Sequence, residues 1–419
     1  MRAEPADLRL ADGTRLLHIG PPKTGTTGLQ AGFHLARDDA REQGVHYAGF
    51  GQHSSTEVRA VLGLRSPWSD ERKPPHIRYW NRLANEIRSS KARHVVLSAE
   101  DLAAADEPAI RHVLADLGEG PVHVVATLRP IARLLPSQWQ QYVQNRLTSS
   151  FEDWLRETLD GEREGRSKDF WRRHRHDELL RRWAGVVGPQ NMTVIVLEEH
   201  DRDRLYRVFE DLVGLRPGTL AREEAPANRS LTLHEIEAVR AFNVLYRQED
   251  LPKSLYTRVM RRGAAALMEE RRPPADEPRV ALPAWSRQQI GDVAEQIVGG
   301  IRATGVRVVG DLDSLAALET GDAAPAGSSI APEIAGTLAM GVLVATGAAR
   351  GTGKTAAHAN DEDGSRPETD RPFGEAPELF RLSTAHLLLV VARRTRAAIL
   401  HRLGRLFRRT RRPSDSGEA

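Results

Sequence analysis

The segment from Arg15 to Gln30, RLLHIGPPKTGTTGLQ, constrains the fold of this chain more than any other. Its first six residues, Arg15 to Gly20, are typical of a short buried strand, and the apolar spacing after Gly28 predicts an amphipathic helix. Between them, Pro21 to Thr27 form a tight loop of Pro, Lys, Gly and Thr. A strand that enters a helix through such a loop leaves backbone N–H groups pointing out of the helix N-terminus, where they can bind an anion.

The side chains of this loop indicate which anion it binds. Lys23 adds a full positive charge with several donors, and the threonines that surround Gly25 add hydroxyl groups. A nucleotide P-loop, GxxxxGK[ST], has its lysine after the second glycine, whereas Lys23 precedes Gly25. The loop therefore predicts a site for a phosphate-like group with a residue order different from that of the P-loop.

Length and composition exclude several classes of protein and of functional site. The chain has 419 residues, long enough to bury a large core, and its formal net charge of +3 gives no overall field for a polyanion such as nucleic acid. The absence of cysteine excludes disulfides, thiolate metal ligands and a cysteine nucleophile. The first ten residues contain no apolar stretch of the kind found in secretory signals, so a soluble cytoplasmic enzyme is expected.

Apolar runs alternate with helical patterns along the first half of the chain. Three runs besides Arg15 to Gly20 are typical of buried strands: His94–Ser98, Val122–Leu128 and Met192–Leu197. The alternation predicts an α/β fold with a doubly wound parallel sheet, whose ligands collect at the carboxyl ends of the strands. Glu100, Arg129 and Glu198 follow these strands and are expected at that edge. Residues 40–60 are expected to form loops, and residues 201–315 to be mainly helical.

A second anion-binding pattern follows the strand Val122–Leu128. Arg129 closes the strand, and Ser137 comes eight residues later, about two turns into the next predicted helix. Arginine suits a phosphate because its planar fork binds two oxygens at once and stays charged. Arg133, one turn after Arg129, is equally consistent with a supporting role and with a surface position.

The two patterns together resemble the PAPS-dependent sulfotransferases of bacterial type, where PAPS is 3′-phosphoadenosine-5′-phosphosulfate. Lys23 to Thr27 match the family's 5′-phosphosulfate loop, and Arg129 with Ser137 match its 3′-phosphate motif. The resemblance covers roughly residues 14–315. It implies a P-loop-like sulfotransferase fold and an enzyme that moves the sulfuryl group from PAPS to a hydroxyl or amine of a carbohydrate or small metabolite, releasing PAP, with no metal.

The resemblance also implies roles for single residues. The donor would be bound by the following residues: Lys23, Thr24, Gly25, Thr26, Thr27, Arg129 and Ser137. Lys23 would neutralise the charge that develops on the leaving phosphate. Cytosolic members also cover the nucleotide with an Arg-Lys-Gly segment near their C-terminus; this sequence lacks one, and Asn228–Ser230 are the candidate replacement.

The general base is left open between several residues. Glu100 follows the strand His94–Ser98, where cytosolic members present a histidine, and burial could raise the pKa of a carboxylate there toward neutrality. His53 is the second candidate, because histidine titrates near neutral pH without adjustment. Asp101 and His46 come after both.

The C-terminal part differs in composition. We expect a sulfotransferase domain over residues 1–317, a low-complexity, mostly disordered linker over 318–376, and a basic amphipathic tail over 377–419. Within the linker, residues 334–349 suit a weak helix too short to span a membrane. Residues 346–355 end in Gly-Lys-Thr but lack a glycine that the P-loop requires. The arginine-rich tail suits a membrane surface or an acidic partner, so peripheral attachment to the inner face of the membrane is expected.

Two other functions fit parts of the sequence. A nucleotide kinase could use the Lys23 loop as a degenerate P-loop, with Glu100 or Glu198 holding Mg²⁺. A membrane-associated protein without catalysis could keep a vestigial nucleotide pocket and act through its tail. The sequence carries no signal for the acceptor or for the oligomeric state.

Overall fold

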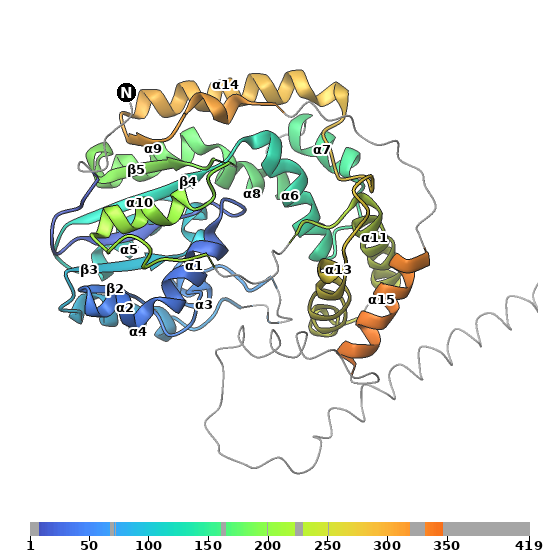
Figure 1. The fold of residues 1–419 in the computed structure, drawn as a ribbon, viewed down its shortest axis with the longest axis horizontal. Coiled ribbons are helices and arrows are strands. Elements are labelled where there is room, and N and C mark those ends of the chain that lie inside the picture. Colours follow the sequence, from blue (N-terminus) through green and yellow to red (C-terminus); the bar gives the residue numbers. More distant parts are fainter. Residues whose placement is uncertain are drawn as a thin grey trace, which may run out of the picture. The chain divides into compact units, whose positions relative to one another are not determined.

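The structure is a computed structural model that describes residues 8–67, 71, 73–160, 165–198, 200–222, 229–249, 251–318 and 332–346 (Figure 1). All of them belong to the first of the chain's two compact units, residues 1–364. Asn228, residues 347–355 and the arginine-rich tail, 377–419, lie outside the described residues, so the predictions made for them stay predictions.

A six-stranded, all-parallel sheet forms the centre of this unit (Figure 1). Its strands, in spatial order, are β2 (Val45–Tyr47), β3 (His94–Ser98), β1 (Arg15–His18), β4 (Val122–Leu128), β5 (Met192–Val196) and β6 (Arg307–Val309). The central strand β1 pairs Leu17 with Leu97 on one side and with Val124 on the other. The four strands expected from apolar runs are confirmed, because a parallel sheet covered on both faces needs continuous apolar sequence.

Helices cover both faces of the sheet, as the doubly wound prediction requires. One face packs against α3 (Ser55–Val61), α4 (Arg78–Ser89), α5 (Glu107–Asp116), α9 (His176–Val187) and α14 (Arg287–Thr304). The other packs against α1 (Thr26–Leu35), α2 (Arg37–Glu42) and α10 (Arg204–Val213). Leu17 belongs to the first core, with Trp80 and Trp183, whereas Leu16 belongs to the second, with Phe33, because successive strand residues point to opposite faces.

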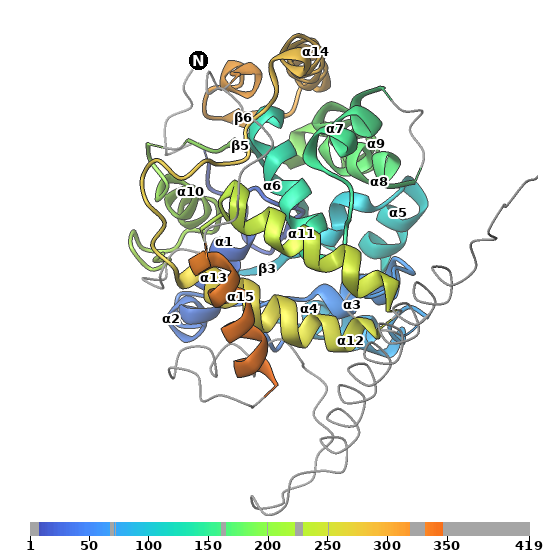
Figure 2. The same cartoon turned by 90° about the vertical axis from the view of Figure 1, so that its right-hand side faces the viewer.

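A third core lies between helices alone. Its helices are α6 (Ile131–Gln144), α7 (Phe151–Asp160), α8 (Gly165–His174), α11 (Leu233–Gln248), α12 (Lys253–Tyr256), the π-helical segment η4 (Thr257–Ala265), α13 (Ala266–Glu270), the first half of α14 and α15 (Pro332–Ala345). Trp139, Trp154 and Met260 are buried at its centre. Figure 2 shows α11, α12, α13 and α15 packed together in front of α1 and β3. The helical character expected for residues 201–315 is confirmed apart from β6.

The structure corrects two expectations. Residues 40–60 are not all loop, because they contain β2 and α3, and β6 interrupts the region expected to be helical. Both strands have three residues, which is too few to give a periodic signal in the sequence. They form as strands because each pairs with a longer neighbouring strand of the sheet. Helix α15 lies inside the segment expected to be a linker and packs against η4; the domain boundaries themselves stay a prediction.

His18, the last residue of β1, links three strands below the edge where the ligands are expected. Its Nδ1 lies 2.8 Å from Ser98 Oγ at the end of β3, and its Nε2 lies 3.1 Å from Thr127 Oγ1 in β4. Complete burial lowers the pKa of His18 from 6.5 to about 3. The imidazole is therefore neutral in the folded protein over the whole physiological range.

Replacing His18 should make the fold less sensitive to acid. Below pH 6.5 the unfolded chain binds a proton on His18 and the folded chain does not, so stability is lost as the pH falls from about 6.5 toward 3. At pH 5 this amounts to about 2 kcal/mol in the free energy of unfolding. Urea unfolding at pH 7 and pH 5 should show a smaller acid loss in His18→Asn than in the parent. The exposed His34→Asn is the control, and an equal loss in all three proteins would contradict the prediction.

Candidate functional site

The loop between β1 and α1 presents an open helix N-terminus. Helix α1 begins at Thr26, and its N-cap is Gly25, which has no side chain to cap the first N–H groups. Gly25 and Lys23 both have left-handed backbone conformations, with φ of 82° and 68°. These two residues turn the chain sharply into the helix, so the first-turn N–H groups and the positive end of the helix dipole are available to an anion.

The three threonines of the loop differ in their surroundings: two are buried and hydrogen-bonded, and one is exposed. The buried Thr24 hydroxyl donates to the Pro21 carbonyl at 2.5 Å and lies 2.8 Å from Thr127 Oγ1. The Thr26 hydroxyl donates to the same Pro21 carbonyl at 3.4 Å, and Thr27 is exposed. The Thr24 and Thr26 hydroxyls therefore hold the shape of the loop, while the open side of the loop presents backbone N–H groups and Lys23.

Hydrogen bonds tie the loop to the neighbouring strands. The Thr127 N–H in β4 donates to the Gly20 carbonyl at 2.9 Å, which fixes the start of the loop. On the other side, Gln30 of α1 donates to the Ser98 carbonyl of β3 at 2.9 Å. His53 Nδ1 lies 2.6 Å from Gln30 Oε1, so this predicted site residue contacts α1 from the segment that precedes α3.

Charged groups from separate elements surround Lys23. Burial lowers the pKa of the Lys23 ammonium, and the positive charges of Arg129 and Arg261 lower it further. The carboxylates of Glu100 and Glu269 act in the opposite direction and raise it. The structure thus brings together Lys23, Glu100 and Arg129, which the sequence places at one edge, and adds Arg261 of η4 and Glu269 of α13.

Glu100 is the acid that follows β3 directly, at the start of the short 3-10 helix η2 (Glu100–Ala104). Burial, and then the negative charge of Asp101, raise its pKa, while Lys23, Arg173 and Arg59 oppose the rise. Close packing brings it to the loop: a Cβ built on Gly20 would lie 3.0 Å from Glu100 Cβ.

The other base candidates of the sequence analysis have different surroundings. Asp101 accepts two hydrogen bonds from Arg59, at 2.8 and 3.1 Å, and so anchors α3 to η2. His46 Nε2 lies 2.9 Å from Glu86 Oε1 of α4. These contacts give Asp101 and His46 structural partners, whereas Glu100 is the base candidate whose charge acts on Lys23.

Ser137 lies in the second turn of α6 and is partly exposed. The residue that precedes α6 is Pro130, so Arg129 lies at the junction between β4 and this helix. Ser137 follows the first helical residue by six positions, or about 9 Å along the axis. Arg129 must therefore extend along the first turns of α6 in order to share a ligand with Ser137.

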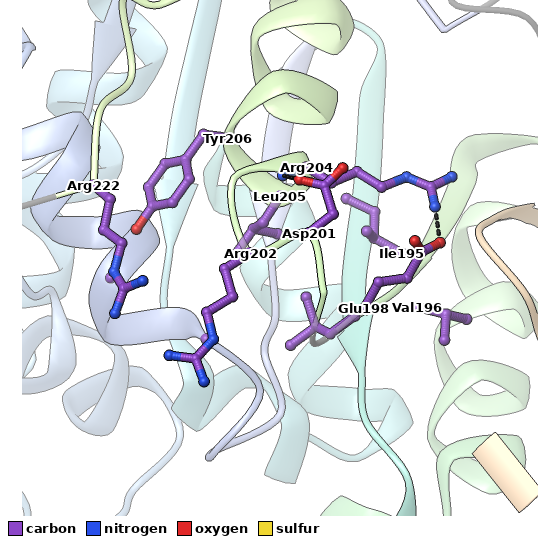
Figure 3. A pocket seen from close by; sticks show the side chains of 12 residues that line it. Ile195, Val196, Glu198, Asp201, Arg202, Arg204, Leu205, Tyr206 and Arg222 are labelled. Atoms are coloured by element: carbon purple, nitrogen blue, oxygen red, sulfur yellow. Dashed lines mark hydrogen bonds and ion pairs between the residues drawn. The ribbon is translucent and has the colours of Figure 1, made fainter. Parts of the chain in front are cut away.

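A pocket of about 230 Å³ adjoins the loop on the side of β5 (Figure 3). Gly25 and Gly28 form its wall at the start of α1, and Arg202, Tyr206 and Arg222 line it with two positive charges and a phenol. A Cβ built on Gly28 would lie 2.8 Å from Tyr206 Oη, so glycine allows α10 to approach α1 closely. The pocket is smaller than the roughly 300–1,000 Å³ that encloses a drug-sized ligand and fits one part of such a molecule.

Glu198 also lines this pocket, but its charge is already paired. Its carboxylate forms an ion pair with Arg204, and its Oε2 lies 3.0 Å from His200 Nε2. Figure 3 shows the first of these contacts as a dashed line at the end of β5.

Sequence reasoning missed Arg202, Tyr206, Arg222, Arg261 and Glu269. Arg202 has a weak signal, because it lies shortly after the end of a predicted strand. Glu269 has none: it occurs in a helical run, and only the packing of α13 brings it toward Lys23.

Comparisons with known proteins add little to this description. No protein-family model matches the chain, and no curated protein matches it. Among solved structures, a sulfotransferase from Alicyclobacillus acidocaldarius matches with 17% sequence identity and a TM-score of 0.35, covering 57% of this chain and 97% of that one. A TM-score of this size does not establish a shared fold, and the α/β class of this chain rests on its own sheet.

The described residues contain neither a cluster of metal ligands nor a helix that could span a membrane. No group of three or more histidine, aspartate or glutamate side chains in the described part of the chain could hold a metal ion. Within the same residues, no helix has both the length and the apolar character needed to cross a bilayer.

The conformation of Lys23 predicts an unusual ranking of two variants. A residue with a side chain pays about 1 kcal/mol in the left-handed region, and glycine does not. Lys23→Gly should therefore be more stable to urea than Lys23→Ala, by about 0.5 kcal/mol, because the greater flexibility of glycine in the unfolded chain offsets part of this cost. Both variants remove the same charge, so each serves as the control for the other. A Lys23→Ala protein at least as stable as Lys23→Gly would show that the loop has another conformation.

Proposed function

We propose that this protein is a PAPS-dependent sulfotransferase, which moves the sulfuryl group from PAPS to a hydroxyl or amine of a carbohydrate or small metabolite and releases PAP. The observation that carries the proposal is the cluster at the carboxyl ends of three adjacent strands. Lys23 follows β1 in a loop that exposes helix N–H groups, Glu100 follows β3, and Arg129 follows β4.

The cluster suits the two ends of the donor. The N–H groups of the loop and the Lys23 ammonium would bind the 5′-phosphosulfate, as they suit any phosphate-like group. Arg129, with Ser137, would bind the 3′-phosphate and fix the donor in line. The pocket beside Gly25 and Gly28 would receive part of the nucleoside.

The reaction can then be written with its atoms balanced. Glu100 accepts the proton of the acceptor hydroxyl, the acceptor oxygen forms a bond to sulfur, and the bond between sulfur and the bridging phosphate oxygen breaks. The electron pair of that bond remains on the 5′-phosphate of PAP, where Lys23 and the loop N–H groups stabilise the charge. The raised pKa of Glu100 suits a base that works near neutral pH. His53, which contacts Gln30, is the second candidate for this role.

The proposal extends to the place of the protein in the cell. We also propose that the enzyme is cytoplasmic and attaches peripherally to the inner face of the membrane. Its basis is the arginine-rich sequence of residues 377–419, which lies outside the described residues.

Loss of either anchor should weaken binding of PAP without unfolding the protein. Lys23→Ala and Arg129→Ala each remove a charged donor, which is worth about 1.5–3 kcal/mol, so isothermal titration should show about 10-fold to 100-fold weaker binding. Both variants should also abolish transfer of labelled sulfate from PAPS in incubations with a panel of sugars, lipids and phenols.

Arg111→Ala, which removes an exposed arginine from α5, is the matched control and should bind PAP like the parent. Thermal shift of the parent with PAP and with ATP–Mg²⁺ separates the proposal from a nucleotide kinase. Stronger stabilisation by ATP–Mg²⁺, or retained sulfate transfer in both anchor variants, would overturn the proposal.

A further inference from the structure

Residues 48–54, which join β2 to α3, are held against α1 and α2 by hydrogen bonds. Arg37 of α2 donates to three carbonyl groups from the end of β2 onward, those of Tyr47, Gly49 and Gly51. The side-chain amide of Gln52 donates to the Thr27 carbonyl in the first turn of α1 at 3.3 Å. These bonds bring the next residue, His53, to α1 beside the loop that carries Lys23.

A chain of hydrogen bonds connects His53 to β3 through Gln30 of α1. Gln30 is 4% exposed, and its Nε2 donates to the Ser98 carbonyl oxygen at 2.9 Å. Because a carbonyl oxygen only accepts, the amide nitrogen of Gln30 must face Ser98, and its Oε1 must face His53. Oε1 is also an acceptor and lies 2.6 Å from His53 Nδ1, so Nδ1 carries the hydrogen of this bond.

The chain of hydrogen bonds fixes the tautomer of the neutral imidazole. Because Nδ1 carries the hydrogen, Nε2 has the lone pair and is the ring atom that can accept a proton. Ser98, at the far end of the chain of hydrogen bonds, is the last residue of β3 and precedes Glu100 by two positions. His53 is therefore held at the same edge of the sheet as Lys23 and Glu100.

We infer that Gln30 is a positioning residue of the proposed reaction, which holds His53 as the Nδ1–H tautomer so that His53 Nε2 takes the proton of the acceptor. This role rests on the proposed function and chooses between its two candidate bases, Glu100 and His53. The proton of the acceptor hydroxyl passes to Nε2, and the acceptor oxygen bonds to sulfur. The bond from sulfur to the bridging phosphate oxygen breaks and leaves its electron pair on PAP. The imidazolium keeps its hydrogen bond to Gln30, which the positive charge strengthens, and then releases the new proton to water.

The tautomer of His53 can be measured in the full-length chain without any nucleotide. Nitrogen-15 chemical shifts distinguish a protonated ring nitrogen from one with a lone pair, and the spectrum of His53→Asn assigns the signals. At a pH where the imidazole is neutral, the parent should show a protonated Nδ1 and an unprotonated Nε2. Gln30→Leu removes the acceptor and should shift His53 toward the Nε2–H form that free histidine prefers. Gln30→Glu keeps an acceptor for Nδ1 and should keep the parent tautomer.

Sulfate transfer from labelled PAPS, with an acceptor found in the panel, gives the second readout. His53→Asn should lower kcat by about 100-fold to 10,000-fold, which is the usual contribution of a general base. Gln30→Leu should lower kcat about tenfold, with the KM for PAPS and the affinity for PAP of the parent, and Gln30→Glu should recover most of this loss. Gln43→Leu is the matched control and should follow the parent. Gln43 also bridges two segments, because it accepts from the Arg216 N–H at 2.8 Å and donates to Thr219 at 3.1 Å.

Three results would overturn the inference: an Nε2–H tautomer in the parent, an unchanged tautomer in Gln30→Leu, and a parent-like kcat in His53→Asn. The first and the last need no variant of Gln30, so they apply even if Gln30→Leu does not fold. A loss of PAP affinity in Gln30→Leu as large as its loss of kcat would show a merely structural role and overturn it too. The expected tautomers in a protein that neither binds PAP nor transfers sulfate would show that the proposed function has failed, while Gln30 still positions His53.

Discussion

The site depends on one half-buried ammonium group in the loop that follows the central strand. Lys23 lies in a left-handed turn directly before an uncapped helix, so its charge and the helix N–H groups meet at one point. Burial disfavours that charge and lowers the pKa of Lys23, while the carboxylates of Glu100 and Glu269 act in the opposite direction. The neighbouring structure serves this arrangement: Thr127 fixes the start of the loop, and Gly20 lets Glu100 approach closely.

The parallel sheet explains how distant parts of the chain assemble this environment. The carboxyl ends of β3, β1 and β4 are adjacent, so the residues that follow them share one edge although other elements separate them in sequence. Neutral His18 joins the same three strands just below that edge through Ser98 and Thr127. The helical core adds a second carboxylate that acts on Lys23, that of Glu269, on a segment that packs against α15.

The sequence predicted those strands and site residues that depend on a local pattern of residues. β3 and β4 were predicted to the residue, because continuous apolar runs mark buried parallel strands, and Glu100 and Arg129 followed from their places after those strands. β2 and β6 were missed because three residues carry no period, and their neighbours in the sheet define them. Glu269 was missed for a related reason: its place among the charges that act on Lys23 depends on how α13 packs, which no spacing in the sequence encodes.

The central claim is that the Lys23 loop and Arg129 bind opposite ends of one nucleotide. A crystal structure of the full-length protein with PAP bound tests it most directly. The account predicts the 5′-phosphate against the loop N–H groups and Lys23, and the 3′-phosphate against Arg129, in a single continuous site. A structure in which Lys23 and Arg129 face separate cavities, or in which PAP binds away from both, would contradict it.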